Sequence, residues 1–178
     1  MKKFFGLAIV SAAAMAMAQA PMAQFIRGEG AAMDAHNHRI SFRIDARKVV
    51  VDNAHQPRIE GTFSAALVGE NNRPAGEVNL RSVREMMIDG HGGRFSGPGA
   101  FVHPGPNGNP VREEGIVQVS VMDNKTADNT DPNATPDRIA IHVVRPPASA
   151  GGNPTVLFAF EGNVGRGDIA IGTRTGRP

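Results

Sequence analysis

The chain of 178 residues contains no cysteine, no tryptophan and no tyrosine. Without cysteine it forms no disulfide, so its fold must depend on packing, on a bound ion or on a partner. The missing thiols also exclude a cysteine nucleophile and a cysteine-ligated zinc site. Phenylalanine supplies all nine aromatic residues. This scarcity argues against a site that stacks sugar rings or nucleic-acid bases.

Residues 1–18 have the composition of a secretory signal peptide. Lys2 and Lys3 precede a run, 4–18, that contains no charged residue. Its end, Ala16-Met17-Ala18, has the small-x-small pattern that precedes signal-peptidase cleavage, here before Gln19. The uncharged run of about 15 residues is shorter than the roughly 20 residues needed to span a bilayer. We therefore predict a secreted or periplasmic mature protein that keeps no stable membrane anchor after cleavage.

The charge of the mature chain is balanced. The whole chain has 19 basic and 17 acidic residues, and removal of Lys2 and Lys3 leaves 17 of each. Nucleic-acid binders gather basic residues among aromatic ones, whereas the arginines here are spread along the sequence. We therefore expect no nucleic-acid partner, and an extracellular ligand or protein that the sequence does not identify.

Apolar residues alternate with polar residues along most of the mature chain. This period of two is typical of strands that bury one face. The clearest segments are 40–46, 59–67, 117–121, 139–143, 156–160 and 169–171, and weaker ones lie at 28–33, 78–80, 86–88 and 95–101. Segments rich in Gly, Pro, Asn and Asp separate them at 70–74, 89–92, 103–110, 124–136 and 146–154.

This pattern predicts one all-β domain over residues 19–178. About nine or ten short strands joined by turns favour an antiparallel β-sandwich of the jelly-roll or immunoglobulin-like type. A closed barrel is the alternative. A mature chain of this length is long enough to build a packed core without disulfides.

The segment from Met87 to Gly99 contains a glycine-rich hairpin pattern, and Val119-Ser120-Val121-Met122-Asp123-Asn124 forms a Val-x-Val-x-Asp-Asn strand end. Together, over roughly 75–143, they resemble uncharacterised secreted bacterial β-sandwich domains. The chain departs from their pattern at His91-Gly92-Gly93, where those domains have Asn-x-Ala. The resemblance implies a β-sandwich fold and an extracellular setting, and it implies no activity.

An acidic loop is the first candidate site. It contains four aspartates, Asp123, Asp128, Asp131 and Asp137, interspersed with asparagines. Calcium takes six to eight oxygen ligands, which such a loop can supply, although the spacing is not that of an EF-hand. The alternative is that these side chains bond their own backbone to form turns.

A pair of histidines is the second candidate site. His36 and His38 are two residues apart, so on a strand they would share a face and could chelate a transition metal. A third ligand could come from His55, His91, His103 or His142, but the sequence places none of them nearby. The alternative is a pair of exposed histidines without a metal.

Other motifs carry less chemistry. The adjacent Glu113 and Glu114 would point to opposite faces of a strand, which does not suit an acid/base pair. Arg166-Gly167-Asp168 reads as a turn before the strand at Ile169. No Gly-x-Ser-x-Gly motif is present.

These observations predict a secreted, non-catalytic module with a structural or binding role. The alternative is a small secreted hydrolase assisted by a metal that the histidines or the acidic loop would hold.

Overall fold

A computed structural model describes residues 22–50, 56–69, 73–124, 135–149 and 151–175. The predicted signal peptide therefore lies outside the described residues. The described chain forms nine strands: β1 Met22–Asp34, β2 Arg39–Val50, β3 Arg58–Val68, β4 Pro74–Leu80, β5 Glu85–Asp89, β6 Gly92–Pro104, β7 Pro110–Met122, β8 Arg138–Arg145 and β9 Thr155–Thr175. Nowhere in these ranges does a helix have the length and apolarity needed to cross a membrane.

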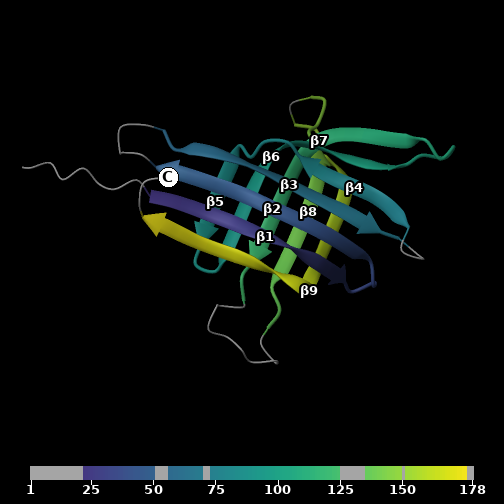
Figure 1. The fold of residues 1–178 in the computed structure, drawn as a ribbon. Coiled ribbons are helices and arrows are strands. Elements are labelled where there is room, and N and C mark those ends of the chain that lie inside the picture. Colours follow the sequence, from purple (N-terminus) through teal and green to yellow (C-terminus); the bar gives the residue numbers. More distant parts are fainter. Residues whose placement is uncertain (1–21, 51–55, 70–72, 125–134, 150, 176–178) are drawn as a thin grey trace, which may run out of the picture.

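The strands form an antiparallel barrel of eight strands with one extra strand. Strands β1 to β4 make one meander and β6 to β9 make another. Two seams join the meanders, the pairing of β1 with β9 and the pairing of β4 with β6. Strands β4 and β5 both pair with β6, β4 with Gly99–Val102 and β5, through Glu85–Asp89, with Gly92–Ser96. Figure 1 shows the two meanders as layers whose strands cross at a steep angle.

The all-β, antiparallel prediction is confirmed, and of the two architectures left open the barrel is the one observed. A jelly roll or an immunoglobulin fold would need long crossover connections. Here, apart from the two seams, the pairings join consecutive strands. Short polar turns between neighbouring strands favour such hairpins over crossovers.

Strand β9 is longer than the sequence pattern suggested, since it unites the segments predicted at 156–160 and 169–171. Its first part pairs with β8 and its second part with β1. The register shifts opposite Ala31 and Ala32, and nearby Gly167 has φ +94°. Because residues 166–168 lie inside this strand, the interpretation of Arg166-Gly167-Asp168 as a turn was wrong.

Most of the predicted apolar faces line the interior of the barrel, but Val156, in the segment predicted at 156–160, is 60% exposed, beside the register shift between Val143 and Val144. Alternate residues of each strand point inward, and Phe63 meets Phe95 edge-on with ring centroids 6.0 Å apart. The largest fully enclosed side chains include Ile26, Ile40, Leu80, Ile139, Ile141 and Ile169. Burial of this apolar surface is the main favourable term in folding, so the barrel is stable by packing, without a disulfide.

Gly167 is a position where the pairing of β1 with β9 depends on glycine. A Cβ atom there would lie 2.1 Å from the carbonyl oxygen of Glu29, and φ is +94°. We expect Gly167→Ala to lower the free energy of unfolding by about 2 kcal/mol or more, since left-handed strain and a backbone clash add. Gly165→Ala, where nothing lies within 4 Å, should change it by less than about 0.5 kcal/mol. Urea denaturation of both variants checks this, and equal losses would contradict it.

Candidate functional site

The turn between β1 and β2 has a defined backbone geometry. The N–H of Asp34 donates to the carbonyl of His38 at 3.0 Å, and the N–H of Asn37 donates to the carbonyl of Asp34 at 3.2 Å. Asn37 has φ +65°, a left-handed conformation that asparagine tolerates well. A tight turn followed by a left-handed residue is a common way to close a three-residue hairpin loop.

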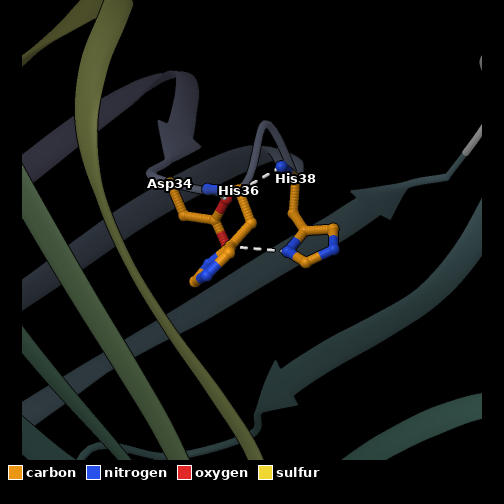
Figure 2. Close-up of side chains that lie close together, drawn as sticks. All are labelled: Asp34, His36 and His38. Atoms are coloured by element: carbon orange, nitrogen blue, oxygen red, sulfur yellow. Dashed lines mark hydrogen bonds and ion pairs between the residues drawn. The ribbon is translucent and has the colours of Figure 1, made fainter.

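The carboxylate of Asp34 organises this turn. Its Oδ1 accepts hydrogen bonds from the backbone N–H groups of His36 and His38, both at 2.8 Å. Its Oδ2 lies 2.8 Å from Nδ1 of His38, as Figure 2 shows. Desolvation acts to raise the pKa of Asp34, but the hydrogen bonds from His38 and His36 outweigh it and hold the pKa below its ordinary value. The carboxylate is therefore held ionised beside the two imidazoles.

Asp34, His36 and His38 form a cluster of possible metal ligands. Each offers one donor atom, and the three atoms lie within 4.8 Å of one another. The imidazole rings have centroids 6.0 Å apart and are tilted by 35°. Only 14% of the Asp34 side chain is exposed, against 74% for His38. Two imidazole nitrogens and a carboxylate oxygen are a ligand set that zinc accepts, and the fourth position of the metal would face solvent.

The structure thus brings the two predicted histidines together, on a hairpin turn instead of along a strand. The third donor, Asp34, was missed because histidine alone was considered for that position. The signal was present in the sequence as Asp-x-His-x-His beside a segment with turn residues.

The other predicted third ligands lie elsewhere. Among the described residues, His91 lies in the turn between β5 and β6. His103 lies near the end of β6 with Nδ1 3.1 Å from the carbonyl oxygen of Pro104. His142 is exposed on β8, where it alternates with the buried Ile141 and Val143. His55 lies outside the described residues.

The described ends of the acidic loop are held to the barrel by hydrogen bonds to backbone N–H groups. Asp137 is completely buried. Its Oδ1 accepts the N–H of Asn124 at 2.9 Å, and its Oδ2 accepts the N–H of Ile169 at 3.1 Å. The carboxylate therefore links the residues after β7 to β9. Asp128 and Asp131 lie outside the described residues.

Asp123 lies beside Asp137 with one oxygen unsatisfied. Its Oδ2 accepts the N–H of Ile171 at 3.2 Å, while its Oδ1 is enclosed and has no hydrogen-bond partner in the described part of the chain. Desolvation raises the pKa of Asp123; the hydrogen bond from Ile171 opposes the rise, and the charges of Asp137 and Asp168 add to it. Buried polar atoms usually have a hydrogen-bond partner, so the unsatisfied oxygen of Asp123 is available to a cation. Calcium binding at this loop stays a prediction.

The adjacent glutamates point to opposite faces of β7, as predicted. Glu113 accepts a hydrogen bond from Arg145 at 3.1 Å and lies 3.4 Å from Nε2 of His103. Glu114, on the outer face, accepts one from Arg112 at 2.7 Å. The two carboxylates therefore do not form an acid/base pair.

The raised pKa of Asp123 predicts a pH-dependent stability. A carboxyl whose folded pKa is raised stabilises the fold below its ordinary pKa of 3.8, and that contribution is lost as pH rises through the folded value. We expect Asp123→Asn to gain stability relative to the natural protein as pH rises from 3 to 7. Thermal unfolding across this range measures the difference. The exposed Asp89→Asn controls for the loss of one charge, and a difference independent of pH would contradict the account.

Comparisons of the chain with protein-family models, with curated proteins and with solved structures gave no match. The resemblance to secreted β-sandwich domains therefore stays a prediction from sequence motifs. Among the described residues, the hairpin cluster of Asp34, His36 and His38 is a group of side chains that supports a specific chemistry.

Proposed function

We propose that this protein is an exported, non-catalytic binding module that captures a divalent transition-metal ion, zinc above all, at the β1–β2 hairpin. The observation that carries the proposal is the placement of three donor atoms, from Asp34, His36 and His38, within 4.8 Å of one another. The secretory composition of residues 1–18 supports export.

The ligand types select the class of metal. Imidazole suits zinc, copper and nickel, whereas calcium and magnesium prefer sites made of oxygen alone. Thiolate, which would favour copper(I) or an iron–sulfur cluster, is excluded because the chain has no cysteine. Two imidazoles and one carboxylate therefore favour a divalent ion of the zinc, nickel and copper group.

The hairpin is arranged for a metal before any metal binds. Oδ1 of Asp34 holds the turn by accepting two backbone N–H groups, which leaves Oδ2 for the metal. Binding replaces the hydrogen bond between Oδ2 and His38 with two metal–ligand bonds. Because the turn is already ordered, little conformational entropy is lost on binding. Exposure of both histidines suits exchange of the ion with solution.

A metal-assisted hydrolase is the second candidate. Three protein ligands leave a position for a water molecule, as in catalytic zinc sites. We favour the binding role because the single carboxylate of the described cluster is already used as ligand and turn cap. Zinc-dependent cleavage of a simple ester that is lost in His38→Gln would favour the hydrolase instead.

Metal binding is tested by titration calorimetry with zinc, nickel and copper. We expect one ion per chain with a dissociation constant on the order of micromolar or below. The double variant His36→Gln/His38→Gln should lose binding, and Asp34→Asn should weaken it by about tenfold or more. The exposed His142→Gln is the matched control and should bind as the natural protein does.

The Asp34 variants separate the two tasks of the carboxylate. Asparagine keeps an oxygen that can accept the two backbone N–H groups, whereas alanine removes it. We therefore expect Asp34→Asn to keep the thermal stability of the metal-free protein and Asp34→Ala to lower it.

Unchanged zinc affinity in the double histidine variant would refute the proposed site.

A further inference from the structure

One face of the barrel gathers arginines that are spread along the sequence. We name the outer face of β1, β2, β3 and the second part of β9 the arginine face. Strand register places seven exposed arginines on it: Arg27, Arg39, Arg43, Arg47, Arg58, Arg166 and Arg174. Four carboxylates share this face: Glu29, Asp45, Glu60 and Asp168. It therefore carries an excess of positive charge on a chain whose mature charge is balanced.

The outward positions of the other strands carry no such excess of positive charge. Strands β4 to β8 and the first part of β9 present three arginines, Arg94, Arg112 and Arg138. They also present five carboxylates, Glu77, Glu85, Asp89, Glu114 and Glu161. In the connection between β4 and β5, Arg81 pairs with Glu114 of this side and Arg84 is exposed as well. The positive excess is therefore confined to the arginine face, which alternation within single strands does not reveal.

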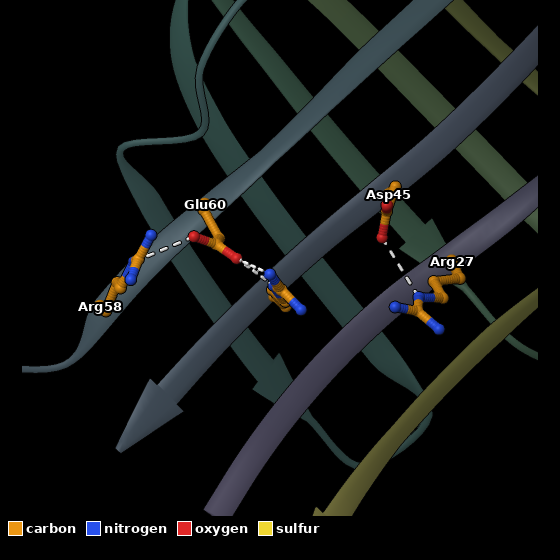
Figure 3. A network of polar contacts seen from close by, with 5 residues as sticks. Arg27, Asp45, Arg58 and Glu60 are labelled. Atoms are coloured by element: carbon orange, nitrogen blue, oxygen red, sulfur yellow. Dashed lines mark hydrogen bonds and ion pairs between the residues drawn. The ribbon is translucent and has the colours of Figure 1, made fainter. Parts of the chain in front are cut away.

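Ion pairs hold part of the arginine face in place. Arg27 Nε lies 3.2 Å from Oδ1 of Asp45, and Glu60 bridges Arg58 and Arg47. Figure 3 shows Arg27 directed toward Asp45 and Arg58 toward Glu60.

By contrast, Arg39, Arg43 and Arg166 form no ion pair with the described residues. Arg39 and Arg43 lie four residues apart on β2, about 13 Å along the strand. Arg166 is two strands away, opposite Ala31, which pairs with Ser41 between those two arginines. Three guanidinium groups therefore surround a patch of short side chains.

A groove of about 590 Å³ lies on the same face. Gly28, Gly167 and Ala170, which have short or no side chains, contribute to its lining. Its charged lining residues are Arg27 and Arg43 together with Glu29, Asp45 and Asp168. The groove is shallow and open to solvent, which suits a chain laid across a surface rather than an enclosed small molecule. The groove thus offers both strong hydrogen-bond donors and strong acceptors.

We propose that the arginine face binds an anionic polysaccharide, one that carries carboxylate, sulfate or phosphate groups. Guanidinium groups bind such anions through paired hydrogen bonds. Sugar hydroxyls both donate and accept, so they can use the carboxylates of the groove as well as its arginines. The inference is independent of the metal site.

The interleaved carboxylates favour this ligand over two other anionic partners. Duplex DNA carries a negative charge for about every 1.7 Å of its axis, and an anionic bilayer presents a continuous charged surface. Either would bring phosphates against Glu29 and Asp168 as well as against the arginines. A polysaccharide with charges spaced by sugar units can place them at Arg39, Arg43 and Arg166 and its hydroxyls at the carboxylates.

The test compares two triple variants that remove the same charge. Arg39→Gln/Arg43→Gln/Arg166→Gln alters the arginine face, and Arg94→Gln/Arg112→Gln/Arg138→Gln alters the opposite side. Binding to immobilised polygalacturonate, heparin and neutral dextran is measured at fixed ionic strength. We expect the natural protein and the opposite-side variant to bind an anionic polymer, the arginine-face variant to bind at least tenfold more weakly, and none to bind dextran.

Several results would overturn the proposal. These are no binding to either anionic polymer, equal loss in both triple variants, or tighter binding to duplex DNA or phosphatidylglycerol vesicles than to the polysaccharides. Circular dichroism checks folding, and the single variant Arg43→Gln gives the same comparison against Arg94→Gln if a triple variant does not fold. Zinc titration of the arginine-face variant should match the natural protein, which keeps this test separate from that of the metal site.

Discussion

The pairing of β1 with β9 is the interaction on which the other features depend. It runs from Met22 opposite Thr175 to Asp34 opposite Gly162, and so joins the N-terminal meander to the C-terminal one. The close approach of the two backbones near Gly30 and Gly167 makes this pairing possible. Without it the barrel would open into one sheet with β1 and β9 as exposed edges, which are prone to pair with other chains.

Both proposed sites follow from that seam. It sets Arg166 and Asp168 of β9 beside β1, and β1 in turn lies beside the arginine row of β2. The same pairing supports the end of β1, so the hairpin that carries His36 and His38 starts from a fixed strand. Asp34 then uses its two oxygens differently, one for the turn and one toward His38. A requirement of the turn, an acceptor for free N–H groups, has placed a carboxylate where the proposed metal would be bound.

Much of the fold could be predicted from the sequence because period-two alternation is a local property. The stripes at 40–46 and 139–143 correspond to observed strands, and the inward faces are the predicted ones. The continuity of β9 could not be predicted, because Gly165 and Gly167 read as turn residues until pairing with β1 is known. Closure was equally hidden, since the pairing of β4 with β6 is not a local property of either strand.

The candidate site was half predicted for the same reason. His36 and His38 stood out by their spacing, but Asp34 gains its position from a turn that depends on the left-handed conformation of Asn37. The arginine face was missed because Arg43 and Arg166 lie far apart in the chain and meet only through strand order. Asp137, predicted as a calcium ligand, accepts backbone N–H groups in the fold, a role that the sequence did not reveal, and calcium binding there stays a prediction.

The central claim, that the hairpin holds a transition metal, is tested most directly by anomalous diffraction from crystals soaked in zinc. The account predicts one strong zinc peak within about 2.0–2.2 Å of Asp34, His36 and His38. A zinc ion bound elsewhere, with His36 and His38 free of metal, would contradict it.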